Sequence, residues 1–170
     1  LTNDCSTLRT TLLTNLIEVV SNNLKQDNGV LEGFEYGHVF SGDLKSQHIE
    51  KEMVAGIFGG VKSKRQWDQT LQTMSWFEGK GKIEDLFRKL NIPILWKFST
   101  SSNYETLLHP YRTAELWISD DQYLGVFGQI HPILARRSSV PNNIFLFEFD
   151  VDLIKKEFYN KNLVSYEPYE

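Results

Sequence analysis

The run of residues 10–24 constrains the fold of this chain most, because aliphatic side chains recur there every three or four positions. On a helix of about 3.6 residues per turn, these side chains form one broad apolar face. Its members are Leu12, Leu13, Leu16, Ile17, Val20 and Leu24. We therefore predict an amphipathic helix whose first turn is capped by Thr10 or Thr11. A face this wide needs a sheet beneath it, a partner helix beside it, or both.

The rest of the chain carries shorter patterns, which bring the total to about six strands and three helices, with a short helix or turn at 132–136. The predicted strands cover residues 30–40, 52–60, 94–99, 112–119, 123–130 and 144–150, and the other predicted helices cover residues 77–90 and 151–159. Because the strands do not alternate regularly with long helices, a parallel doubly wound sheet is disfavoured. The pattern predicts an α+β fold, with an antiparallel sheet flanked by helices.

Composition restricts the class of protein. The 170 residues are 41% apolar, which suits one compact domain, and no apolar run approaches the roughly 20 residues of a membrane helix. The single cysteine, Cys5, excludes an internal disulfide and fits a reducing compartment. The net charge is −4, and the basic runs at 62–65 and 136–137 are short. A stand-alone tRNA-binding module is therefore disfavoured, since such proteins usually gather positive charge.

The familiar signatures of phosphate loops, dinucleotide sites, zinc proteases and serine hydrolases do not occur in the sequence. Two histidines precede prolines, at His109 and His131, and two carboxylates, Glu115 and Glu148, lie in predicted strands. These four side chains allow one alternative, a stand-alone enzyme that uses a metal ion or acid–base chemistry on a small molecule. Neither histidine has the spacing of a metal-ligand pair, and a histidine before proline more often caps a turn.

Acidic residues inside apolar strands are a second unusual feature, because a plain core avoids charge. We expect these carboxylates to meet arginines in ion pairs, either at the ends of the sheet or in a polar cleft over its open face. The predicted cleft set is Arg9, Glu35, His109, Arg112, Glu115, His131 and Glu148.

Five segments, in order, resemble the β subunit of phenylalanyl-tRNA synthetase in its bacterial and organellar form. They are residues 8–13 (LRTTLL), 34–40 (FEYGHVF), 108–115 (LHPYRTAE), 128–132 (GQIHP) and 146–150 (LFEFD). Together they span most of the chain, and they are similar to landmarks of the catalytic-core-like domain of that subunit.

The resemblance implies a class II aminoacyl-tRNA synthetase fold in residues 1–160, followed at 161–170 by a linker toward a C-terminal anticodon-binding domain. In the family this domain is a degenerate copy of the catalytic core and does not activate phenylalanine. We therefore expect no catalytic, cofactor-binding or metal-binding residue in this segment. The whole enzyme would use ATP and Mg²⁺ at sites elsewhere, and this chain lacks the arginine-ended glycine motif that binds ATP in class II enzymes.

The resemblance also implies partners and a location. The domain would scaffold the catalytic α subunit in a heterotetramer of two α and two β chains that charges tRNA(Phe), without a membrane, in bacterial cytoplasm or plastid stroma. The opening helix would correspond to the class II dimerisation helix. Its predicted interface residues are Leu12, Leu16, Ile17, Val20 and Leu24, with a place in the domain's own core as the other reading.

Overall fold

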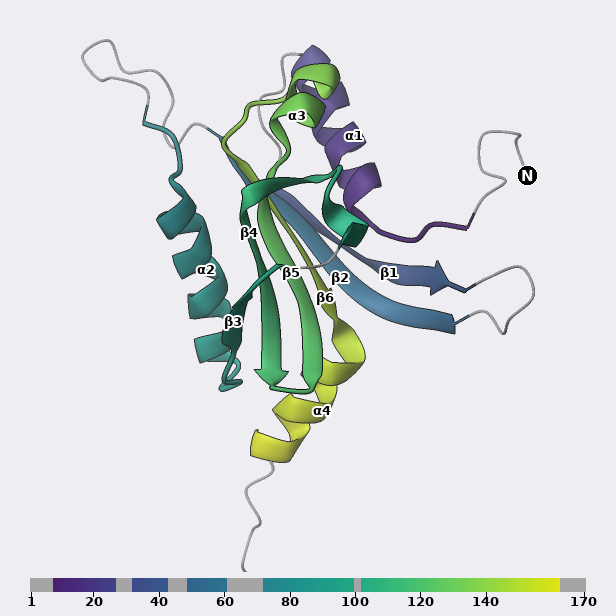
Figure 1. The fold of residues 1–170 in the computed structure, drawn as a ribbon, viewed down its shortest axis with the longest axis vertical. Helices are drawn as coiled ribbons and strands as arrows, with labels where there is room; N and C mark the ends of the chain where they lie inside the picture. Colours follow the sequence, from purple (N-terminus) through teal and green to yellow (C-terminus); the bar gives the residue numbers. More distant parts are fainter. Residues whose placement is uncertain (1–7, 27–31, 43–48, 61–71, 100–101, 163–170) are drawn as a thin grey trace, which may run out of the picture.

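The computed structural model of the chain describes residues 8–26, 32–42, 49–60, 72–99 and 102–162. Cys5, the basic run at 62–65 and the predicted linker from residue 163 onward lie outside the described residues. Six strands form one sheet in the order β1-β2-β6-β5-β4-β3, and every neighbouring pair is antiparallel (Figure 1). The predicted α+β architecture with an antiparallel sheet of six strands is thus confirmed.

The elements lie close to their predicted positions. The strands are β1 (Gly33–Ser41), β2 (Ile49–Gly59), β3 (Leu95–Phe98), β4 (Leu108–Ser119), β5 (Gln122–Ile130) and β6 (Ile144–Asp150), and the helices are α1 (Leu13–Lys25), α2 (Trp76–Lys89), α3 (Pro132–Ser138) and α4 (Val151–Asn162), with a 3-10 turn η2 (Ser102–Tyr104). The largest difference is in β4, which starts four residues before the predicted residue 112. A bulge interrupts its alternating pattern there and conceals the strand from sequence analysis.

Helices cover both faces of the sheet (Figure 1). On one face α1 and α3 pack over an aliphatic core that includes Ile57 and Leu146. On the other face α2 and α4 pack over an aromatic core that includes Phe127 and Phe149. Because successive residues of a strand point to opposite faces, β6 supplies both cores. Its apolar residues on both parities are therefore explained by its position near the centre of the sheet.

The helix starts follow from local chemistry, with one correction. Ser75 and Glu78 form a capping box at the start of α2, in which each side chain accepts a hydrogen bond from the other residue's backbone N–H. At α1 the N-cap position is Leu12, so the predicted cap by Thr10 or Thr11 is one residue out of place. The Thr11 hydroxyl nevertheless accepts a hydrogen bond from the Leu13 N–H at 3.1 Å. None of the described helices is long and apolar enough to cross a membrane.

Candidate functional site on the sheet face

A row of mostly polar residues runs across the sheet on the face that α1 partly covers. Residues that lie directly opposite each other in neighbouring strands point to the same face. Reading the pairings from β1 to β3 gives Glu35, Ala55, Glu148, Val126, Glu115 and Lys97. Three of the predicted cleft carboxylates therefore share one face, although the outermost two, Glu35 and Glu148, are more than a hundred residues apart in sequence.

Glu148 is the most buried of these carboxylates, with a side chain 1% exposed. It accepts hydrogen bonds from the Leu12 backbone N–H at 2.7 Å, from the Thr11 hydroxyl at 3.0 Å and from the Tyr104 hydroxyl at 2.7 Å. Burial raises the pKa of the Tyr104 hydroxyl, and the neighbouring Glu148 carboxylate raises that pKa further. Tyr104 is thereby held as a neutral donor. The Glu148 carboxylate joins the start of α1 to the centre of the sheet.

Glu35 forms the predicted ion pair with Arg9, whose Nη1 lies 2.5 Å from the carboxylate oxygen Oε1. Arg9 also donates its Nε–H to the His38 carbonyl at 2.9 Å, and its own carbonyl accepts from the Phe40 N–H at 2.9 Å. These bonds attach the segment before α1 to strand β1. Both side chains are about one-third exposed, so the pair contributes little to stability and acts mainly in positioning.

Glu115 lies in the same row and is 6% exposed. It accepts hydrogen bonds from the Ser99 hydroxyl at 3.3 Å and from the Trp117 indole N–H at 3.2 Å. Arg112, which we expected beside a carboxylate, donates instead to the amide oxygen of Gln129 at 2.9 Å. The predicted cleft residues are thus distributed over several local networks, and each network serves the domain's own structure.

The histidines that support the alternative enzyme reading both act as local hydrogen-bond acceptors. The Nδ1 of His109 accepts from the Tyr111 N–H at 3.1 Å, and the Nδ1 of His131 accepts from the Ile133 N–H at 3.2 Å, at the start of α3. Burial lowers the pKa of His109, and nearby Arg112 and His131 lower it further. Within the described ranges, no group of three histidine, cysteine, aspartate or glutamate residues is arranged to hold a metal ion.

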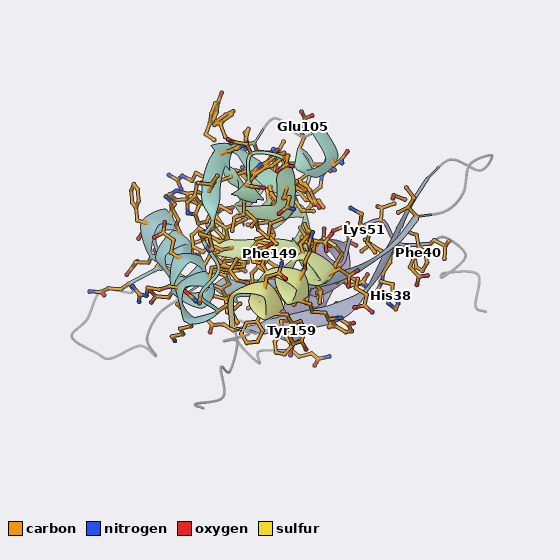
Figure 2. The ribbon with its side chains drawn as sticks, turned by 90° about the horizontal axis from the view of Figure 1, so that it is seen from below. His38, Phe40, Lys51, Glu105, Phe149 and Tyr159 are labelled. Carbon is orange, nitrogen blue, oxygen red and sulfur yellow. The ribbon has the colours of Figure 1, made fainter. Side chains whose placement is uncertain are left out.

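A pocket of about 290 Å³ lies next to this row, and Ser99, Tyr104, Glu105 and His109 contribute polar atoms to its lining. Figure 2 shows Glu105 and Tyr159 on opposite sides of the molecule, with His38, Phe40 and Lys51 on the β1–β2 arm away from Glu105.

Sequence analysis missed Tyr104, because a lone tyrosine in a short turn carries no pattern that links it to a strand 44 residues away.

The predicted interface residues of α1 lie against the domain's own sheet. Leu12 and Val20 are fully buried, and Leu16 and Ile17 are 7% and 4% exposed. Leu24 is partly buried against the same core. In the single chain these side chains therefore belong to the domain's own core. Their contact with another subunit stays a prediction. The outward side of α1 carries Val19, which is 44% exposed.

Comparison with known proteins gives a consistent result. Residues 1–151 match the family model described as the phenylalanyl tRNA synthetase beta chain CLM domain. The chain is 47% identical over 169 residues to the chloroplastic phenylalanine–tRNA ligase beta subunit of Phaeodactylum tricornutum, which covers 99% of this chain and 24% of that one. It is 41% identical over 151 residues to the phenylalanine–tRNA ligase beta subunit of Trichormus variabilis, covering 88% of this chain and 18% of that one.

The chain therefore spans about a quarter or less of the length of these curated relatives. The fold is also similar to a solved structure of PylSc, a pyrrolysyl tRNA synthetase of Desulfitobacterium hafniense. The TM-score is 0.57 at 15% identity, and the match covers 86% of this chain and 48% of that one. This likeness concerns the fold alone, and it agrees with the α+β, synthetase-like architecture predicted from the sequence. By its match over residues 1–151 and by these relatives, the chain belongs to the phenylalanyl-tRNA synthetase beta chain CLM domain family.

Proposed function

We propose that this domain is the non-catalytic core of a phenylalanine–tRNA ligase β subunit and scaffolds the catalytic α subunit. The whole enzyme attaches phenylalanine to tRNA(Phe) with ATP and Mg²⁺, as a heterotetramer of two α and two β chains, in a plastid stroma or a bacterial cytoplasm. The observation that carries the proposal is the family match over residues 1–151. The chloroplastic and bacterial names of its relatives support the ligase activity and the location.

The non-catalytic role is supported by the bonding of the polar row. A catalytic carboxylate needs a free oxygen or a reachable proton in a substrate pose. Glu148 instead holds the first turn of α1 and Tyr104, and Glu115 holds Ser99 and Trp117. The hydrogen bonds of these two carboxylates thus serve the cohesion of the domain.

The scaffold role is supported by the outward side of α1 and the groove beside it. A groove of about 360 Å³ lies beside the contact between α1 and α3 and is lined by Thr14, Glu18, Leu134 and Arg137, among others. The exposed side chain of Val19 lies on the outward side of the same helix. Since the inward leucines pack on the sheet, this outward surface is where a helix of the catalytic subunit would contact the domain.

Two measurements test the proposal. The purified domain should show no phenylalanine-dependent exchange of pyrophosphate into ATP, whereas the α–β complex should show it, and robust exchange by the domain alone would refute the non-catalytic role. Co-expression with the catalytic subunit then tests the interface. Val19→Asp places a charge in the contact and should weaken assembly at least tenfold, because a buried unpaired charge costs several kcal/mol.

The matched control is Leu86→Asp on α2, since Leu86 is 40% exposed and Val19 is 44% exposed. Both variants should fold, because both side chains already contact solvent. We expect assembly to be lost in Val19→Asp and kept in Leu86→Asp. Equal assembly of the two variants would contradict the assignment of α1 as the surface that binds the catalytic subunit.

A further inference from the structure

Strand β4 contains a large bulge that is fixed by its own hydrogen bonds. Leu108 pairs with Ile130 and Thr113 pairs with Gly128, so the four residues 109–112 lie opposite Gln129 alone. The Thr113 hydroxyl donates to the His109 carbonyl at 2.7 Å, and Arg112 donates to Gln129 at 2.9 Å. Bulges of this kind redirect side chains out of the regular sheet pattern.

The bulge projects Tyr111 into solvent, where its side chain is 85% exposed. Phe77, near the start of α2, is 80% exposed, and these two are the most exposed large apolar side chains of the described residues. Both line the same open pocket, which has a volume of about 540 Å³. Trp76, the neighbour of Phe77 at the start of α2, stacks its ring on Phe127 at 5.0 Å and so anchors this end of the helix. Two exposed aromatic rings on one pocket are unusual for a surface that only meets water.

Arg112 adds positive charge to the pocket that the two rings line. Arg112 is exposed, and its hydrogen bond to Gln129 uses one of five guanidinium N–H groups. Among the described residues, no carboxylate forms an ion pair with Arg112. The planar guanidinium can therefore donate its other N–H groups to an anion such as a phosphate group, without breaking its existing hydrogen bond.

We propose that this pocket, lined by Phe77, Tyr111 and Arg112, binds one unpaired nucleotide of the tRNA that the ligase charges. The base stacks on the aromatic rings, and the adjoining phosphate meets the guanidinium. A nucleotide uses both features of the pocket, whereas an apolar protein segment would use only the rings. The acidic net charge of the domain is no obstacle, because a single contact needs only local positive charge. The inference rests on the proposed function, which supplies the tRNA.

The test uses the complete α–β complex and measures the dissociation constant for tRNA(Phe) by filter binding at several salt concentrations. Tyr111→Ala and Phe77→Ala should each weaken binding roughly 5- to 100-fold, the usual effect of losing one stacked base. Arg112→Gln should reduce the slope of log K against log salt by about one. Tyr111→Trp should keep wild-type affinity, because tryptophan also stacks.

The matched control is Phe34→Ala, since Phe34 is 77% exposed on β1 and does not line the pocket. It should bind tRNA like the wild type. If the wild-type complex assembles and charges tRNA but the Tyr111 and Phe77 variants bind tRNA normally, the inference is wrong and the proposed function stands. If these variants lose the α subunit instead of tRNA, the pocket holds a protein and the inference is equally wrong. If the wild-type complex does not assemble or charge tRNA, both proposals fail.

Discussion

Replacing Glu148 by alanine tests whether the buried carboxylate holds the domain together. The carboxylate is 1% exposed and accepts hydrogen bonds from the Leu12 N–H, the Thr11 hydroxyl and the Tyr104 hydroxyl. In Glu148→Ala all three donors lose their acceptor. The start of α1 then loses its hydrogen bonds to the Glu148 side chain of β6, although the aliphatic core beneath the helix remains.

The size of the effect follows from which donors stay buried. The Leu12 N–H is shielded from water, and an unsatisfied buried donor costs about 1–3 kcal/mol. Thr11 and Tyr104 are both partly exposed, so their hydroxyls can turn to water at little cost. We expect Glu148→Ala to lower the free energy of unfolding by about 1–3 kcal/mol, a sizeable part of the total for a domain of this size.

The assay is urea unfolding of the purified domain followed by circular dichroism. Tyr104→Phe removes one donor without leaving the Tyr104 site unsatisfied, so it serves as the second arm of a double-mutant cycle. The coupling energy between the two positions should lie at about 0.5–3 kcal/mol. A Glu148→Ala domain within about 0.5 kcal/mol of wild type, or a coupling energy of zero, would refute the reasoning.

Three further predictions concern the backbone, a helix start and acid stability. Gly125→Ala should unfold the domain or lower its melting temperature severely, because a Cβ at its φ of +154° would lie 2.0 Å from the Glu148 carbonyl oxygen. Ser75→Ala should cost about 1 kcal/mol in urea unfolding by removing the cap of α2, and Ser75→Asp should restore most of it. Hydrogen bonds from the Lys155 ammonium and then the Tyr36 hydroxyl lower the pKa of Glu52 from 4.5 to about 2. The stability from this pair is therefore complete above pH 4.5 and is lost as the pH falls toward 2, and Glu52→Gln should flatten the pH dependence of the melting temperature in that window.

The sequence predicted the helices and regular strands of this fold well, because the spacing of their apolar residues follows from which side of each element is buried. In β6, aromatic and aliphatic residues alternate because each face of the strand packs into a different core. In α1, the three-to-four spacing arises because one side of the helix packs on the sheet. The start of β4 was missed, since a four-residue bulge destroys the period-two pattern at residues 109–112. The N-cap of α1 is one residue later than predicted, because the Leu12 N–H is satisfied by Glu148 from a distant strand, although the Thr11 hydroxyl does accept the Leu13 N–H.

The sequence indicated which residues of the candidate site are unusual, but it did not show which of them contact each other. Unexpected charge in apolar strands drew attention to Glu115 and Glu148, which the pairings place on one face of the sheet. Which carboxylate each arginine meets could not be specified from sequence; in the structure Arg9 pairs with Glu35. Tyr104 could not be found, because side-chain hydrogen bonds across the fold leave no local trace in the sequence.

The hydrogen bond from the Leu12 N–H to Glu148 joins two residues 136 positions apart. At a synthesis rate of about 5–20 residues per second, the opening helix leaves the ribosome on the order of ten seconds before its acceptor exists. During this interval the apolar face of the helix has no sheet to pack against and is exposed to chaperones and to other nascent chains. Because α1 is synthesised before β6, its apolar face needs protection during synthesis. In the folded domain the sheet already covers that face, so the need is no longer visible.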